Sequence, residues 1–546
     1  MSLELSWLDT KVAKLEATET LIVKARGRAR DVLKLHAPTP KQMKLTEVSC
    51  LQRSDLTHTH TGDNLHITVS PAAGVDEELT FTFKFSLDFS KSISGGLMYH
   101  NGRPSGKNET EKSPMIFSQG EAELNRMWFI GHDFPNERLT TELNVRVPVG
   151  FQAISNGGLV EHKIEADFEQ WHWRMSLPHV NYLVVLAIGK WSAVQLPAAK
   201  IERDGKVDEI PCTVWTAIGT EERAKDAFAN TPRMLEFFSR KFDEPYPWER
   251  YDQVLVRNYG SSGMENSAAA ILGDMALANW KPGGPELEML MAHELSHQWF
   301  GDLVTCRSWE HIWLNEGWAT FSEALWAAEL AGGGDAGQLA HNLVMEHYRD
   351  EQYISNADAP VDASAMVDRR YSNADAVFEK ADNPYAKGGW VLQMLRHKVG
   401  EAAFWRGTHA YLNMWKFKEV ETSEFRRVME DASGESLEYF FDQWCYHPGI
   451  PMIEYSVDWD SSKGIAKVDW RQTQAISAAR PAWEIDLPVV FMRENEIWRC
   501  VIPISGTAGS ASFHASPGER PNAVMDPLIT VLCSVREVVP ATTPIR

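Results

Sequence analysis

Two histidines four residues apart form the part of this sequence best suited to bind a metal ion. They are His293 and His297 in MLMAHELSHQWFGD, residues 289–302, and Glu294 follows the first histidine directly. In a helix, residues four apart are rotated by only about 40° and lie about 6 Å apart along the axis. Both imidazoles would therefore lie on one helix face, a spacing that suits a single tetrahedral zinc ion. Glu294, rotated by about 100° from His293, would flank the ion and could take a proton from a water molecule that the metal activates.

A carboxylate further along the chain could complete the ligand set. A zinc site that keeps one position open for water commonly has three protein ligands. Glu316, in WLNEGWATFSEAL, follows His297 with 18 residues between them and lies in the next helical pattern. A loop of about ten residues would allow this second helix to fold back beside the first. We predict a zinc site formed by His293, His297 and Glu316; the alternative is a buried structural pair of histidines.

The elements that must position these groups follow from the apolar patterns. In LTFTFKFSLDF, residues 79–89, apolar and polar residues alternate, and this period of two predicts a half-buried strand. Further alternating segments and turn clusters follow in the same region. We therefore predict an N-terminal β domain over residues 1–195.

Helical patterns begin near residue 196 and end near residue 450. Examples are ERAKDAFANTPRMLEFFSRKF, PELEMLMAHELSHQWFG and LNEGWATFSEALWAAELAG. Pro285 near the start and Gly301 after the end delimit the helix that carries the histidine pair. Alternation returns after Pro451, with a turn at residues 460–464. These patterns predict an α+β multidomain chain with a mainly helical domain over residues 196–450 and a C-terminal β-sandwich over residues 451–546.

Composition excludes several classes of protein and partner. The formal net charge of −21 argues against nucleic acid and anionic membranes as partners. No apolar run approaches the roughly 18 residues that a membrane span requires. Six scattered cysteines without a CxxC pair indicate neither a disulfide framework nor a cysteine-zinc site. The start MSLELSWLDTKV lacks the regions of a signal peptide, so we expect a cytoplasmic protein, or a periplasmic or secreted one if the N-terminus has been trimmed.

The sequence HELSHQWFG followed by NEGWA resembles the signature of the aminopeptidase N and leukotriene A4 hydrolase family, which are gluzincin zinc metallopeptidases. Three further stretches strengthen the resemblance: GSSGMENSA (260–268), NPYAKGGWVLQML (383–395) and FSQGEAELNRMWFIGHDFP (117–135). The resemblance extends from about residue 75 to the end of the chain and implies the family's order of a β domain, a thermolysin-like catalytic domain and a β-sandwich.

This resemblance implies one zinc ion per chain and a role for each matching residue. Glu294 would be the general base, and Tyr385 would donate a hydrogen bond to the developing oxyanion. Glu265 would bind the ammonium group of a peptide's N-terminus, with Gln119 as a second acceptor. Three more residues would flank the substrate: Gly263, Met264 and Asn266.

Several of these residues also have plainer interpretations. Without the resemblance, Tyr385 would be read as a packed core tyrosine, Glu265 as a loop glutamate and Gln119 as a strand glutamine. Glu323, seven residues after Glu316, could support a ligand histidine or lie exposed on the surface. The histidines of THTHTGDNLHI, residues 57–67, are more typical of a solvated hairpin than of a metal site.

The functional hypothesis is a zinc aminopeptidase that removes the N-terminal residue of peptides with a free N-terminus. The alternatives are an endopeptidase or epoxide hydrolase of the same fold, and a catalytically silent peptide-binding module. Two departures from the family pattern are expected to matter. Ser262 stands where the family's exopeptidase motif usually has glycine, and no helical C-terminal domain follows the β-sandwich, which predicts a more open cleft.

Overall fold

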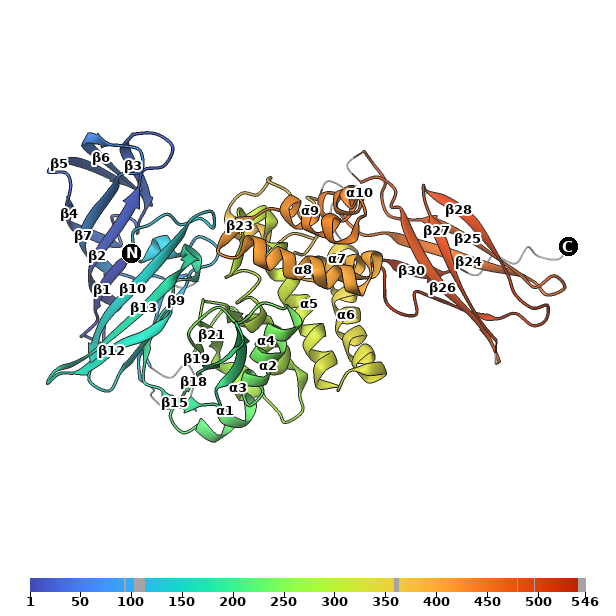
Figure 1. Ribbon diagram of the computed structural model, residues 1–546, viewed down its shortest axis with the longest axis horizontal. Coiled ribbons are helices and arrows are strands. Elements are labelled where there is room, and N and C mark those ends of the chain that lie inside the picture. Colours follow the sequence, from blue (N-terminus) through green and yellow to red (C-terminus); the bar gives the residue numbers. More distant parts are fainter. Residues whose placement is uncertain (93–94, 103–112, 358–362, 479, 495, 539–546) are drawn as a thin grey trace. The chain divides into compact units, whose positions relative to one another are not determined.

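The computed structural model describes residues 1–92, 95–102, 113–357, 363–478, 480–494 and 496–538 (Figure 1). It contains two compact units, Met1–Trp309 with Leu412–Val420 and Glu310–Tyr411 with Glu421–Arg546. Along the chain, strands come first, helices follow and strands return (Figure 1), which confirms the predicted α+β class. The predicted domain boundaries near residues 195 and 450 stay predictions.

The N-terminal part of the first unit is built from three sheets. In sheet order, the seven-stranded sheet comprises β12 (Gly158–Ile164), β13 (Phe168–Val180), β10 (Arg138–Pro148), β1 (Ser2–Ser6), β2 (Lys14–Lys24), β7 (Glu78–Asp88) and β4 (Met43–Cys50). The four-stranded sheet comprises β11 (Gln152–Ser155), β14 (Leu186–Gly189), β9 (Met115–Gln119) and β8 (Gly96–His100). The third comprises β3 (Arg30–His36), β6 (Asn64–Ala73) and β5 (Asp55–Thr61).

Strand β7 shows why this region folds as sheet. Leu79, Phe81, Phe83, Phe85 and Leu87 are all buried, and the residues between them are more exposed. Successive side chains of a strand point to opposite faces, so the alternation covers one face and leaves the other accessible. The predicted strand is confirmed.

A mixed sheet and four helices complete most of the first unit. The five-stranded sheet comprises β15 (Ser192–Gln195), β18 (Cys212–Thr216), β19 (Tyr251–Val256), β21 (Ala269–Gly273) and β20 (Gly263–Met264). The helices are α1 (Glu221–Ala227), α2 (Thr231–Lys241), α3 (Asp274–Asn279) and α4 (Pro285–Ser296). Two short pairs are β16 (Ala199–Arg203) with β17 (Lys206–Ile210), and β22 (Val304–Cys306) with β23 (Lys418–Val420).

Two of the expected helices differ from their patterns. The segment ERAKDAFANTPRMLEFFSRKF forms α1 and α2 rather than one helix, because Pro232 lacks an amide proton and stands in the first turn of α2. Helix α4 begins at Pro285 as predicted but ends at Ser296, before Gly301. His297 caps α4 with φ −56° and ψ −26°, so its backbone is still helical.

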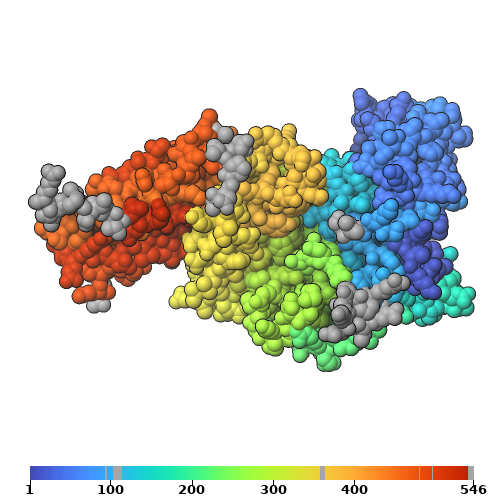
Figure 2. Space-filling view, turned by 180° about the vertical axis from the view of Figure 1, so that it is seen from behind, coloured from blue at the N-terminus to red at the C-terminus, as the bar shows by residue number. Residues whose placement is uncertain are grey.

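The second unit contains the remaining helices and two sheets. The helices are α5 (Trp313–Leu330), α6 (Gly334–Ala357), α7 (Ala386–Val399), α9 (Thr422–Ser433) and α10 (Glu438–Phe441), together with most of α8 (Glu401–Trp415). The yellow segment that includes α6 lies at the surface in Figure 2. The sheets are β28 (Ala508–His514), β25 (Ile465–Gln472), β24 (Met452–Asp460) and β30 (Ser534–Glu537), and β27 (Glu496–Ile504), β26 (Ile485–Arg493) and β29 (Asn522–Met525).

Two absences concern the described residues. None of their helices combines the length and the apolar character that crossing a bilayer requires. All six cysteines are free thiols, and five of them are buried.

Candidate active site

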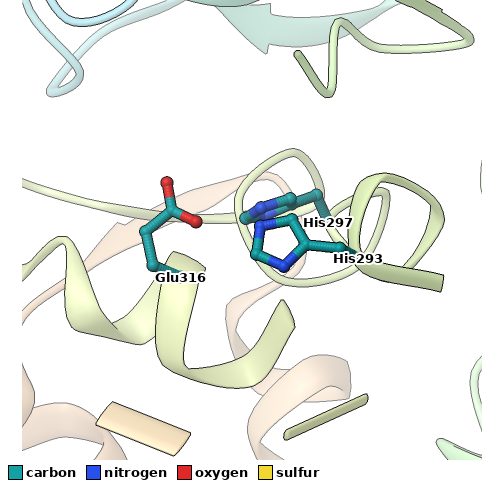
Figure 3. Close-up of side chains that lie close together, drawn as sticks. All are labelled: His293, His297 and Glu316. Atoms are coloured by element: carbon teal, nitrogen blue, oxygen red, sulfur yellow. The ribbon is translucent and has the colours of Figure 1, made fainter. Parts of the chain in front are cut away.

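The three predicted metal ligands lie together. One donor atom each from His293, His297 and Glu316 can be chosen so that all three lie within 4.8 Å of one another. Figure 3 shows the two imidazole rings side by side with the Glu316 carboxylate facing them. Metal–ligand bonds to zinc are about 2.0–2.2 Å long for nitrogen and oxygen donors, so one ion can reach all three only when they converge in this way. Among the described residues, no other group of three metal-binding side chains converges like this.

The hydrogen bond of His297 fixes which ring nitrogen can bind a metal. Its Nδ1 lies 2.9 Å from the carbonyl oxygen of Phe300. A carbonyl oxygen only accepts, so Nδ1 carries the proton and donates it, and the lone pair of this neutral ring lies on Nε2. Such a bond to the second nitrogen is the usual way in which a protein orients a histidine ligand. The donor set therefore fits a zinc ion.

Glu316 is positioned by a backbone contact between two helices of the second unit. Its neighbour Gly317, on α5, meets Gly388, on α7, so closely that a Cβ atom on Gly317 would lie 2.7 Å from the Gly388 carbonyl carbon. A Cβ atom on Gly388 would lie 2.9 Å from Cα of Gly317. Only glycine at both positions permits this approach without movement of the backbone. The crossing of α5 and α7 thus sets the location of Glu316.

Tyr385 stands at the start of α7, three residues before this crossing. It occupies the N-cap position of the helix, and the Asn383 side chain accepts hydrogen bonds from the amides of Tyr385 (2.8 Å) and Ala386 (3.2 Å). Its ring is tilted against Phe378 at a centroid distance of 6.2 Å. These contacts hold the backbone from which the phenol projects, and the catalytic role of Tyr385 stays a prediction.

A fully buried ion pair holds the same helix start. Lys387 Nζ lies 2.7 Å from Asp382 Oδ2, and the two side chains are 0% and 1% exposed. Lys387 also donates to the carbonyl oxygens of His447 (3.2 Å) and Gly449 (2.9 Å), while the amide of Gly449 donates to Asp382 Oδ1 (2.9 Å). Every donor of the ammonium group is therefore used, which compensates for the loss of water around two buried charges. No pattern in the sequence pointed to this pair.

In the first unit, the proposed base Glu294 contacts the strand that precedes Glu265. A Cβ atom on Gly263, in β20, would lie 2.0 Å from Glu294 Oε1. The backbone of β20 therefore passes directly against this carboxylate, and Glu265 follows Gly263 by two residues. The proposed base therefore lies against the strand that leads, two residues later, to the proposed ammonium anchor.

Glu265 is buried, at 3% exposure, and not the solvated loop residue of the plainer interpretation. Its Oε1 accepts a hydrogen bond from the Tyr182 hydroxyl at 3.3 Å, and its backbone carbonyl accepts one from Gln298 at 2.8 Å. Burial raises the pKa of the Asp302 carboxyl group well above its usual range, and the nearby Glu265 carboxylate raises it further. Two buried acids this close disfavour each other's charged form, so a cation bound between them would be stabilised.

Gln119 contributes to the same region. Its Oε1 accepts a hydrogen bond from the hydroxyl group of Tyr259, and its Nε2 donates to the Met264 sulfur at 3.5 Å. Oε1 already accepts this hydrogen bond from Tyr259. The predicted interaction of the Gln119 amide with an ammonium group would thus use the second lone pair of the same oxygen. Tyr259 was not identified from the sequence, where it is an isolated tyrosine before the glycine of GSSGMENSA.

Glu121 is a further acid that the sequence analysis missed. Burial raises the pKa of both Tyr182 and Tyr259 well above the usual range, and the carboxylates of Glu265 and Glu121 raise them further. Both acids therefore lie near both phenols. The signal was present in QGEAEL, where Glu121 follows Gln119 by two residues.

The remaining predicted residues have structural contacts. Asn266 is fully buried and donates to the carbonyl of Leu183 at 3.3 Å, and Met264 is also buried. Their roles toward a substrate stay predictions. Glu323 is buried rather than exposed, and both of its oxygens accept from Tyr348 at 2.8 and 2.7 Å.

Two family models match this chain. The model of the Peptidase M1 N-terminal domain matches residues 7–183, and that of the Peptidase family M1 domain matches residues 226–444. Aminopeptidase N of Streptomyces lividans is 29% identical over 65% of this chain and 41% of its own length. Glutamyl aminopeptidase of Rattus norvegicus is 24% identical over 74% of this chain and 42% of its own length. The chain thus spans about two fifths of the length of these curated relatives.

A solved structure shares the fold. The crystal structure of Legionella pneumophila aminopeptidase A in complex with aspartic acid aligns with a TM-score of 0.79 at 17% identity, covering 98% of this chain and 59% of that one. Peptidase family M1 is a family of metallopeptidases, and the His–His–Glu group is a possible metal site of the kind that such a family requires. The chain belongs to peptidase family M1, and the predicted family resemblance is confirmed.

We expect Gly388→Ala to reduce the free energy of unfolding by about 1–3 kcal/mol, because the added methyl group overpacks the crossing with Gly317. Thermal and urea unfolding measure the loss. Gly389→Ala is the matched control, since its nearest neighbour is a Thr320 methyl group at 3.0 Å, which can shift. Equal stability of Gly388→Ala and the parent would contradict the proposed importance of the backbone contact.

We expect Lys387→Met to lower the free energy of unfolding by about 3–5 kcal/mol, because it leaves the Asp382 carboxylate buried without its cation. Adding Asp382→Asn should restore part of this loss, since asparagine removes the charge and can still accept from Gly449. A double-mutant cycle in urea measures the coupling. Strictly additive effects would show that the two side chains act independently.

Proposed function

We propose that this chain is a zinc-dependent aminopeptidase that hydrolyses the N-terminal residue from peptides. The observation that carries the proposal is the contact of Gly263 with Glu294, two residues before the buried Glu265. This contact places the proposed base beside the strand that leads to the Glu265 carboxylate. A carboxylate near the base suits the ammonium group of a peptide that is cut one residue from its N-terminus. Membership of family M1 and the names of the aminopeptidase relatives support the same activity.

His293, His297 and Glu316 would hold one zinc ion per chain. When bound, zinc supplies Lewis-acid chemistry, polarising the scissile carbonyl and lowering the pKa of water to about 7. The neutral tautomer of His297, fixed by the Phe300 carbonyl, is the form that a metal requires.

The protein's own groups would then move the proton and stabilise charge. Glu294 accepts the proton of the attacking water through its carboxylate and returns it to the departing amine. The hydroxyl group of Tyr385 donates a hydrogen bond to the oxygen of the scissile carbonyl as negative charge develops on it.

Substrate selection would depend on the acids of the first unit. Glu265 and Glu121 lie near the same two phenols, so a protonated N-terminus finds two carboxylates in a buried region. The Tyr182 hydroxyl and the Gln298 amide keep Glu265 in place. An N-acetylated peptide lacks the cation and would leave these charges uncompensated.

We expect Glu294→Gln to lower kcat on aminoacyl-anilides by at least about 10²-fold, because the amide cannot accept the proton. Bound zinc, measured by elemental analysis, should be retained. Chelation should abolish turnover and added zinc should restore it. Full activity in Glu294→Gln would contradict the assigned base, and absence of activity in the zinc-loaded parent would favour a silent peptide-binding module.

We expect Glu265→Gln to lower kcat/KM for free-amine anilides by about 10²–10³-fold, because a buried cation loses its counter-charge. Glu323→Gln is the matched control, since Glu323 is also buried but bonds to Tyr348. The parent should not cleave N-acetylated substrates. Equal cleavage of acetylated and free peptides would support an endopeptidase instead, and preferred opening of an epoxide would support the epoxide hydrolase.

A further inference from the structure

A strongly basic segment stands out in this acidic chain. Five of the eleven residues in KARGRARDVLK, residues 24–34, are lysine or arginine and one is aspartate, whereas the whole chain carries a formal net charge of −21. We propose that these residues and the free edge of β3 form a docking groove for an extended acidic peptide segment of a partner protein. This inference is independent of the proposed peptidase activity.

The five basic side chains are directed to solvent. Lys24, Arg26, Arg28, Arg30 and Lys34 are all exposed. In the part of the chain that the structure describes, the ion pairs do not include any of these five residues. None of the five charges is therefore held in a close ion pair, although Glu78 stands opposite Lys24 and Glu137 lies nearby, and the five together give a local positive potential.

The backbone beside these side chains offers an open strand edge. In the three-stranded sheet of the first unit, β3 pairs with β6 on one side only (Figure 1). At its end, His36 exchanges both backbone hydrogen bonds with Gly131, at 2.7 and 3.0 Å. The amides of an antiparallel strand alternate in direction, so those of Val32 and Lys34 point to the same side as that of His36. No described residue forms backbone hydrogen bonds with Val32 or Lys34 on the side where Gly131 pairs with His36.

A cavity of about 740 Å³ lies along this edge. Arg26, Arg30 and Lys34 line it, and its floor is apolar, with Leu33 and Leu35 among the lining residues. The combination of backbone donors and acceptors, an apolar floor and a basic rim is what the addition of a peptide strand requires.

The basic side chains beside β3 determine which kind of peptide strand can pair with its edge. Lysine and arginine on an edge strand discourage pairing with neutral or basic strands, because their charges would be brought together or desolvated. An acidic strand is attracted instead. A nucleic acid also carries negative charge, but its phosphates extend well beyond a Debye length of about 10 Å at 0.1 M salt and would meet the negative remainder of the chain. A short acidic peptide remains within the basic patch.

The test uses the full chain and an acetylated, amidated, fluorescein-labelled peptide of about eight alternating glutamate and valine residues, long enough to span β3. Acetylation removes the free amine that the proposed peptidase site would bind. Fluorescence anisotropy at about 50 mM salt should show saturable binding that weakens as salt rises. The charge-reversed peptide of lysine and valine should not bind.

Two variants and a modified peptide separate the contributions. Arg30→Glu with Lys34→Glu should weaken binding by at least about tenfold, whereas Lys200→Glu with Lys206→Glu, an equal charge change on an exposed hairpin, should leave it unchanged. Both double variants should keep the parent's thermal unfolding midpoint. A peptide N-methylated at alternate residues keeps its charge but loses half of its amide donors, and should also bind at least about tenfold more weakly.

Three results would overturn the proposal. The first is absence of peptide binding at millimolar concentration. The second is equal binding of the N-methylated peptide, which would show that strand pairing is not involved. The third is tighter binding of a single-stranded RNA oligonucleotide or of phosphatidylglycerol vesicles than of the peptide, lost in Arg30→Glu with Lys34→Glu, which would identify a polyanion or lipid surface as the occupant.

Discussion

Close backbone contacts at glycine determine where the chemically important groups of this chain lie. Gly317 and Gly388 bring α5 and α7 together without intervening side chains, and this crossing locates Glu316 and the start of α7. Gly263 brings β20 against Glu294 in the same way. A Cβ atom at Gly317 or Gly388 would meet backbone, and one at Gly263 would meet the Glu294 carboxylate. Catalytic geometry tolerates little displacement of either kind. The site therefore depends on the missing side chains of these three glycines as well as on the functional groups themselves.

Each of the two units contains buried charged groups. Glu265, Asp302 and the Lys387–Asp382 pair are all nearly inaccessible to solvent. Charges in such places cost free energy unless they are paired or hydrogen-bonded. Lys387 and Asp382 are fully satisfied within the protein, which makes them a rigid support. Glu265 and Asp302 instead place two acids near each other, an arrangement that favours a cationic ligand.

The sequence predicted the fold class and the histidine pair, because both depend on local periodicity, and it predicted Glu316 from the short loop that lets the next helix fold back. Alternation identified β7, and the spacing of His293 and His297 required only helical geometry. Contacts between residues far apart in the chain were harder to predict from the sequence. Glu121 is more than a hundred residues from Glu265 along the chain, and only its position two residues after Gln119 pointed to it. Tyr259 precedes Glu265 by six residues, but nothing in the pattern marked it as part of the site. The early end of α4 at Ser296 was also missed, since the apolar pattern continues beyond it.

The end of α4 has a consequence for local motion. His293 lies within the last turn of the helix, whereas His297 caps it, so an ion held by both would tie the terminus to Glu316 on α5. Helix ends fray more readily than helix centres, and a ligand that binds only the closed form lowers the population of the frayed one. Amide hydrogens at residues 296–300 would then exchange with deuterium far more slowly in the metal-loaded protein than in the apoprotein. The ion would thus stabilise the local fold of the polypeptide in addition to its role in catalysis.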